Sequence, residues 1–95
     1  MDLNPRERNL EAYLRKECDK RSWLCVKCRY DGWPDDVVVT DTGAHGWIEL
    51  KRRRGGRVSP LQAVRAEELI LRKAWMVFAN SEAQVDAFLA HLEAM

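Results

Sequence analysis

Apolar residues recur every four positions near the start of the chain, with polar residues between them: Leu10, Leu14 and Cys18. This spacing places the three side chains on one face of an amphipathic helix. Asn4 is followed directly by proline, and asparagine as N-cap with proline at the first helical position is a typical helix start. The pattern predicts a helix that Asn4 caps and that runs to about Lys20.

Three segments with strand character follow this helix. Residues 23–30 alternate in side-chain type, and residues 36–40 are a β-branched run that favours a strand. Residues 46–51 form the third strand, and the short polar connection at 41–45 predicts a hairpin between it and the second. Between the first two strands, Asp31-Gly32 predicts a turn and Pro34 fixes the path of the chain.

The second half of the chain predicts a helix, a strand and a final helix. Ser59 opens a helix to about Lys73, after a flexible break at Gly55-Gly56. Residues 74–79 form a continuous apolar strand. Ser81 opens the last helix, whose apolar residues repeat on one face: Val85, Phe88, Leu89 and Leu92. The order is αβββαβα, which predicts one α/β domain over residues 1–95 with a mixed sheet.

Composition narrows the class of protein. A chain of 95 residues with 46% hydrophobic and 33% charged residues is typical of one soluble globular domain. No apolar run approaches the ~20 residues of a membrane span, and the N-terminal residues lack a signal-peptide layout, which favours a cytoplasmic setting. There the three cysteines are expected to be free thiols, and the CxxC of Cys25 and Cys28 lies in a strand pattern that argues against a zinc site.

Charged residues at the strand ends are the candidate chemistry. Trp47, Glu49 and Lys51 share one face of the third strand, because alternate strand residues do. A hairpin centred near Gly43 places Asp35 opposite Lys51 and diagonal to Glu49, and diagonal neighbours lie ~7–8 Å apart. That separation leaves room for a divalent cation between the two carboxylates. A register slip of one residue would move Asp35 to the other face.

These parts fit phosphodiester hydrolysis. A cation held by Asp35 and Glu49 could activate a water and offset the charge that grows on phosphorus. Lys51 could position the water or contact the phosphate, and the peptide carbonyl of Leu50 could complete the oxygen ligands. Net charge is only +1, yet residues 51–57 carry five positive charges in seven positions. Such a run next to the acids predicts contact with the nucleic-acid backbone.

Four short motifs occur in a fixed order along the chain: Gly32-Trp33-Pro34-Asp35, Glu49-Leu50-Lys51, Gly55-Gly56-Arg57 and Ser59-Pro60-Leu61-Gln62. In this order they resemble the virus-type replication-repair nuclease (VRR-NUC) domain of the PD-(D/E)XK nuclease superfamily. The resemblance implies a restriction-endonuclease-like αβββαβ core, with a mixed central sheet flanked by helices and an added C-terminal helix. Stand-alone phage and bacterial members imply a homodimeric, Mg²⁺- or Mn²⁺-dependent DNA endonuclease of DNA repair that cuts four-way (Holliday) junctions.

The resemblance also implies roles for single residues. Asp35, Glu49 and the Leu50 carbonyl would hold the metal, Lys51 would be the catalytic lysine, and Gln62 would orient the site or touch DNA. The acid of the first helix is either Glu11 or Glu7. Asp36 adds a second acid beside Asp35, although strand alternation predicts that it points away. The candidate DNA-binding residues are basic positions around the motifs: Lys27, Arg29, Arg52, Arg53, Arg54 and Arg57.

Other interpretations compete with this one. A nuclease of the same core could nick or degrade ordinary duplex DNA, or the chain could be a catalytically idle basic DNA-binding module. In the latter case the acids would form a surface ion network that contributes little. Trp33 and Trp47 lie near enough to the site to contact bases, although tryptophans are more often core residues. The run 69–71 in the second helix has more apolar residues than one face needs, which predicts the dimer surface there.

Overall fold

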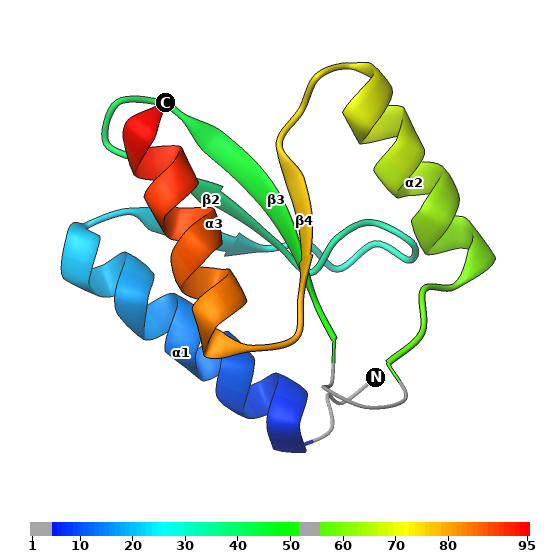
Figure 1. Ribbon diagram of the computed structural model, residues 1–95, viewed down its shortest axis with the longest axis horizontal. Coiled ribbons are helices and arrows are strands. Elements are labelled where there is room, and N and C mark those ends of the chain that lie inside the picture. Colours follow the sequence, from blue (N-terminus) through cyan, green and yellow to red (C-terminus); the bar gives the residue numbers. More distant parts are fainter. Residues whose placement is uncertain (1–4, 52–55) are drawn as a thin grey trace.

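The computed structural model describes residues 5–51 and 56–95 and confirms the predicted αβββαβα order (Figure 1). The elements follow one another along the chain as α1 (Pro5–Arg21), β1 (Leu24–Lys27), β2 (Asp36–Val39), β3 (His45–Leu50), α2 (Pro60–Leu71), β4 (Met76–Ala79) and α3 (Glu82–Ala94). Asn4, the predicted cap of α1, lies outside the described residues.

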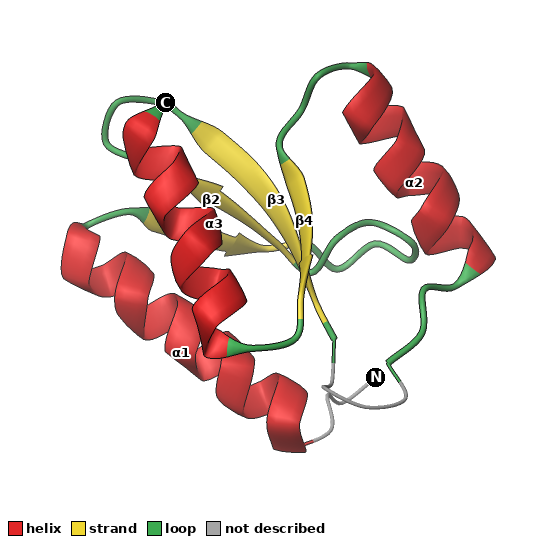
Figure 2. Cartoon of the chain, in the orientation of Figure 1, coloured by secondary structure: helices red, strands yellow, loops and turns green. Residues whose placement is uncertain are grey.

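The four strands form one mixed sheet in the order β1-β2-β3-β4 (Figure 2). The first three are antiparallel neighbours, and β4 runs parallel to β3 because α2 carries the chain back to the starting end. Helices α1 and α3 cover one face of the sheet. Helix α2 lies on the other face, where its Gln62 reaches the outward-pointing side chain of Glu49. The predicted α/β fold with a mixed central sheet flanked by helices is confirmed.

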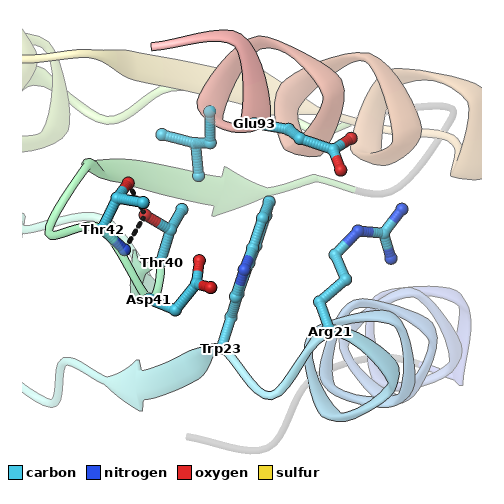
Figure 3. Close-up of a pocket in the computed structure, with 7 residues that line it drawn as sticks. Arg21, Trp23, Thr40, Asp41, Thr42 and Glu93 are labelled. Atoms are coloured by element: carbon cyan, nitrogen blue, oxygen red, sulfur yellow. Dashed lines mark hydrogen bonds between the residues drawn. The ribbon is translucent and has the colours of Figure 1, made fainter.

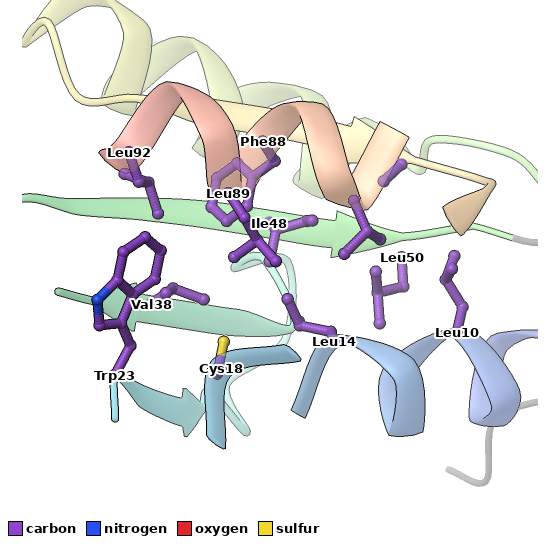
Figure 4. Packing of buried hydrophobic residues seen from close by; sticks show 12 residues of the cluster. Leu10, Leu14, Cys18, Trp23, Val38, Ile48, Leu50, Phe88, Leu89 and Leu92 are labelled. Carbon is purple, nitrogen blue, oxygen red and sulfur yellow. The ribbon is translucent and has the colours of Figure 1, made fainter. Parts of the chain in front are cut away.

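The core lies between the sheet and the helix pair α1 and α3 (Figure 4). Both predicted helical stripes are buried there: Leu10, Leu14 and Cys18 from α1, and Val85, Phe88, Leu89 and Leu92 from α3. They pack against the inner face of the sheet, where Val38, Ile48 and Leu50 are also buried. This single layer of apolar side chains fixes the ends of β2 and β3, which carry the candidate site.

Two predicted strands are shorter in the structure by two residues or more, and the strand predicted at 36–40 ends one residue early, at Val39. The strand predicted at 23–30 covers only Leu24–Lys27. Trp23 precedes it and closes α1 by donating its N–H to the Cys18 carbonyl at 3.0 Å. The strand predicted at 74–79 begins at Met76, because the N–H of Ala74 still bonds the carbonyl of Leu69 in α2. Residues 28–35 leave the sheet as a loop that links β1 to β2.

The predicted hairpin register is wrong by two residues. Asp36 pairs with Ile48 and Val38 pairs with Gly46, so continuing this register puts Asp35 opposite Glu49 rather than Lys51. The cause is the turn, where the Thr40 N–H donates to the Ala44 carbonyl at 2.8 Å and centres the hairpin one residue earlier than predicted. A shift of two residues keeps side-chain parity, so the predicted face of Asp35 is preserved.

The loop between β1 and β2 is held against α2 by Gly32. This glycine has a φ of +83°, and an added Cβ would lie 2.3 Å from Cγ of Leu61. Gly43 in the hairpin has a similar φ of +89° with nothing within 4 Å. We expect Gly43→Ala to lower the free energy of unfolding by about 1–2 kcal/mol through backbone strain alone. Gly32→Ala should cost about 1–3 kcal/mol more, because its methyl group overlaps Leu61.

Urea unfolding of the two variants measures this difference. In a Leu61→Ala background the extra cost at Gly32 should vanish, because the overlapping atoms are gone and only backbone strain remains. Equal costs for Gly32→Ala and Gly43→Ala would show that the loop does not rest on α2.

Candidate active site

Asp35 lies at the point where β2 begins, and its carboxylate is fixed by the backbone of β3. Oδ2 of Asp35 accepts the N–H of Leu50 at 2.8 Å. At its base the loop is closed by a second bond, from the Cys28 N–H to the Asp35 carbonyl oxygen at 2.7 Å. Asp35 is therefore bonded to β3 through its side chain and to the residue that follows β1 through its backbone, although it lies just before β2.

The proline before this acid affects the backbone carbonyl of Leu50, the last residue of β3. The strand pairs end at Asp36–Ile48, and two further steps in the same register would bring Pro34 opposite Leu50. The N–H and C=O of a strand residue point to the same neighbouring strand. Leu50 therefore directs both toward β2, where Asp35 takes the N–H and Pro34 has no N–H to offer the carbonyl. The Leu50 carbonyl consequently has no donor from the position opposite it.

Glu49, Lys51 and Gln62 form one hydrogen-bonded group on the α2 side of the sheet. Nε2 of Gln62 donates to Oε2 of Glu49 at 2.8 Å, and Nζ of Lys51 donates to Oε1 of Gln62 at 2.8 Å. Lys51 Nζ also lies 3.3 Å from Oε2 of Glu49. The structure thus brings the three predicted residues together, and Gln62 bridges the acid and the amine.

Gln62 takes part in the N-terminal cap of α2 and in the candidate site at the same time. Its Oε1 accepts the N–H of Ser59 at 3.0 Å, and its own N–H donates to Oγ of Ser59 at 3.1 Å, which is a complete capping box. The same side chain reaches the acid and the amine of β3. The cap therefore sets the orientation of the amide that contacts the site.

Burial makes both acids of the site, Asp35 and Glu49, harder to ionise. Glu49 is 4% exposed, and its Oε1 is buried without a hydrogen-bond partner. Burial and the nearby Asp35 carboxylate raise the pKa of Glu49 to about 7. Burial also raises the pKa of Asp35, although the bond from Leu50 works in the opposite direction. Two acids that are costly to ionise in a small region form a site that favours a bound cation.

Glu11 of α1 lies near the same end of the sheet, where β2 begins. Its two oxygens accept from Nζ of Lys27 at 3.0 and 2.8 Å, and its charge contributes to the raised pKa of Asp35. The structure thus locates Glu11, one of the two acids predicted from the first helix, near Asp35. The side chain of Glu7 lies outside the described residues.

The candidate DNA-binding residues differ in their surroundings. Lys27 is half-buried and engaged by Glu11, which places it within the charged network rather than on an open surface. Arg29 and Arg57 are exposed. Arg52, Arg53 and Arg54 lie outside the described residues, so their predicted contacts with DNA remain predictions.

Asp36 points away from the site, as strand alternation predicted. It is fully buried on the face that α1 and α3 cover, where its Oδ1 lies 3.1 Å from a guanidinium nitrogen of Arg15 in α1. Burial, followed by the charge of Glu11, raises its pKa to about 6. The sequence analysis missed Arg15, which follows Glu11 by one helical turn and also lies 3.5 Å from it. That i, i+4 spacing was the available signal.

A hollow of about 240 Å³ lies at the opposite end of the sheet, beside the β2–β3 turn (Figure 3). Its walls come from the end of α1, the turn and the end of α3: Arg21, Trp23, Thr40, Asp41, Thr42, Leu92 and Glu93. Arg21 is already paired with Glu17 at 3.2 Å and lies over the ring of Trp23. None of the candidate catalytic residues lines this hollow, so it is separate from the acids.

The donor set restricts which groups could hold a cation. Among residues 5–51 and 56–95, no group of three or more His, Cys, Asp and Glu side chains is arranged to hold a metal ion. A cation held where β2 begins and β3 ends would therefore rely on Asp35, Glu49, the Leu50 carbonyl and water. These are all oxygen ligands, which Mg²⁺ and Mn²⁺ accept.

The mixed four-stranded sheet, with α1 and α3 on one face and α2 on the other, defines an α/β core. A solved structure described as a VRR_NUC domain has this fold, with a TM-score of 0.82 and 24% sequence identity. The match covers 93% of this chain and 98% of that one. The chain therefore has the fold of a VRR_NUC domain, as its motifs implied. No known protein-family profile and no curated protein matches the sequence.

None of the helices in the described part of the chain is both long and apolar enough to span a membrane.

Proposed function

We propose that the chain is a metal-dependent DNA endonuclease of the VRR-NUC type, which hydrolyses phosphodiester bonds in four-way junctions or other branched DNA. One observation carries the proposal. Asp35, Glu49 and Lys51 come together where β2 begins and β3 ends, with Gln62 bridging the last two, in a chain that has the fold of a VRR_NUC domain.

The oxygen atoms at these strand ends are ligands of the kind that Mg²⁺ and Mn²⁺ accept. Oε1 of Glu49 is a buried oxygen without a partner, and Pro34, which precedes Asp35, has no N–H to offer the Leu50 carbonyl. With Asp35, these groups would hold the ion. When bound, such an ion lowers the pKa of a water and offsets charge on the phosphate.

The side chains around these acids have separate tasks. Lys51 presents an ammonium group that Glu49 and Gln62 hold in place, and it would donate to a phosphate oxygen or orient the attacking water. Gln62 keeps the amine and Glu49 at a fixed distance. The Leu50 N–H prevents the Asp35 carboxylate from rotating. Such fixed positions reduce the reorganisation needed during the reaction.

Cleavage assays test the proposal. Four-way, flapped and linear duplex DNA would each be incubated with the purified protein, with Mg²⁺ or with a chelator. We expect Mg²⁺-dependent cutting of the branched substrates. Equal cutting of linear duplex would favour a non-selective nuclease of the same core, and binding without any cutting would favour a DNA-binding module.

The basic segment after β3 is expected to provide phosphate contacts. Replacing Arg52, Arg53 and Arg54 with alanine should weaken DNA binding and reduce the slope of log K against log salt by up to about 3, since each phosphate contact contributes ~0.9. Binding titrations at several salt concentrations measure this slope. The double variant Arg72→Ala/Lys73→Ala, at the far end of α2, is the control and should leave it unchanged. An unchanged slope in the triple variant would place DNA on another surface.

A homodimer is also part of the proposal, since two symmetric sites suit a junction with approximate two-fold symmetry. Exposed apolar residues on α2 support this helix as the contact surface. Ile70 is 58% exposed and Leu71 is 71% exposed, whereas Leu69 is buried in the chain itself. Sedimentation velocity at several concentrations tests the assembly. A monomer at every concentration would contradict it.

A further inference from the structure

Tyr30 is the most exposed large hydrophobic side chain in the described part of the protein, with 79% of its surface open to solvent. It lies in the loop that leads from β1 to Asp35. An isolated exposed aromatic residue needs no explanation on a surface. Tyr30 differs because hydrogen bonds anchor the loop that carries it and because this loop ends at Asp35 of the candidate active site.

The loop is anchored at its base and along its length. The Cys28 N–H bonds the Asp35 carbonyl oxygen at 2.7 Å, and the Trp33 N–H bonds the Tyr30 carbonyl oxygen at 3.2 Å. Between these bonds, Gly32 rests on Leu61 of α2. The turn from Tyr30 to Trp33 therefore has a fixed shape, with its glycine at the position that needs a positive φ.

The two tryptophans near the site are already used for packing. The ring of Trp33 lies 5.9 Å from that of Trp47, and the guanidinium carbon of Arg65 lies 4.9 Å from the Trp33 ring centre. Both tryptophans are half-buried. They hold the loop against α2 and the sheet, and they leave Tyr30 as the aromatic ring of this loop that is open to a ligand.

The position of Tyr30 relative to the acids limits what it can touch. Its Cα lies within about 8 Å of the Cys28 Cα, because consecutive Cα atoms are ~3.8 Å apart. Cys28 is itself bonded to Asp35. Successive nucleotides of a strand rise ~3.4 Å along duplex DNA, so Tyr30 lies within a few nucleotides of a phosphate at the acids. Arg29, next to it, is also exposed.

Building on the proposed nuclease function, we infer that Tyr30 is a specificity residue that stacks on an unpaired base beside the scissile phosphate. In continuous duplex DNA each base face is covered by its neighbours, so no face is offered to the ring. At a branch point or in a single-stranded flap a base face is free, and aromatic side chains bind such faces with little regard to sequence. Tyr30 thereby favours branched DNA over linear duplex.

Binding measured without cleavage tests this inference. Wild-type protein, Tyr30→Ala and Tyr30→Phe would be titrated, in the presence of Ca²⁺, with a flapped DNA and with a linear duplex. The flap carries the fluorescent adenine analogue 2-aminopurine at its first unpaired position, and stacking quenches its emission. We expect Tyr30→Ala to lose about ten-fold or more in affinity for the flap, the loss expected for one base–aromatic stack. Its affinity for the duplex should stay unchanged.

The quenching should disappear in Tyr30→Ala and persist in Tyr30→Phe, which keeps the ring. Leu24→Ala is the matched control, because Leu24 is 63% exposed on β1 and should affect neither measurement. Equal affinities of wild type and Tyr30→Ala for the flap, or equal losses for flap and duplex, would overturn the inference. If wild type cuts branched DNA and Tyr30→Ala has the same substrate preference, this inference fails alone. If wild type cuts no DNA with Mg²⁺, the proposed function itself fails.

Discussion

Replacing Glu49 with glutamine should lower the rate of DNA cleavage by about a thousand-fold or more while leaving the affinity for junction DNA nearly unchanged. Metal-ion stabilisation of the transition state contributes several kcal/mol, and each ~1.4 kcal/mol is a factor of ten in rate. Glutamine keeps the shape of Glu49 and an oxygen that can accept from Gln62 and Lys51. It removes the negative charge that would hold the cation. Single-turnover cleavage with Mg²⁺ measures the loss, and junction binding is measured with Ca²⁺.

Two adjacent acids provide a second test and its matched control. Asp35→Asn should lose activity in the same way, because the Asp35 carboxylate lies beside the end of β3 that carries Glu49. Asp36→Asn changes the adjacent residue in the same manner, yet its side chain is buried on the opposite face beside Arg15. It should keep most of the activity. Cleavage that survives in Glu49→Gln but not in Asp36→Asn would mean that the site lies on the other face of the sheet.

The stability of the metal-free protein should fall as the pH rises from about 5 to about 8. The folded pKa of Glu49 is raised from 4.5 to about 7, and that of Asp36 from 3.8 to about 6. A carboxyl with a raised folded pKa contributes stability that is fully present below its unfolded pKa and is lost as the pH passes its folded pKa. Since one pKa unit is ~1.4 kcal/mol, we expect a loss of several kcal/mol. Urea unfolding in a chelator at the two pH values measures it.

Mn²⁺ should restore much of this stability at pH 8 and little at pH 5, because a cation binds the ionised acids and a protein that binds a ligand only when folded gains stability. Glu49→Gln should show a weaker pH dependence, since only the raised pKa values of Asp35 and Asp36 would remain, and almost no gain from Mn²⁺. A wild-type protein that becomes more stable from pH 5 to pH 8 in chelator would contradict the assigned pKa shifts.

The sequence predicted the elements well where the pattern was long. The stripes of α1 and α3 each bury several apolar side chains, and such repeats leave little choice of secondary structure. The strand ends were predicted less well. Residues 28–30 continue the alternation of β1, and the Cys28–Asp35 bond extends the β1–β2 pairing by one step, but the contacts of Gly32 with Leu61 of α2 then draw the chain into a loop. These contacts join distant parts of the sequence, so a local pattern does not contain them.

The candidate site was predicted in its members but not in its contacts. Asp35, Glu49 and Lys51 followed from alternation, and the error of two residues in register left their shared face intact. The register itself depends on how the Thr40–Ala44 bond closes the hairpin, which the residue types do not fix. The pairs Glu11–Lys27 and Arg15–Asp36 depend on the angle at which α1 lies across the sheet, and a local sequence pattern does not contain that angle.

The most direct test of the central claim is a calorimetric titration of Mn²⁺ into the wild-type protein, Asp35→Asn, Glu49→Gln and Asp36→Asn at neutral pH. The account predicts Mn²⁺ binding by the wild type and by Asp36→Asn, and its loss in the other two variants. Equal binding by all four proteins, or none by the wild type with branched DNA present, would show that Asp35 and Glu49 do not form a metal site.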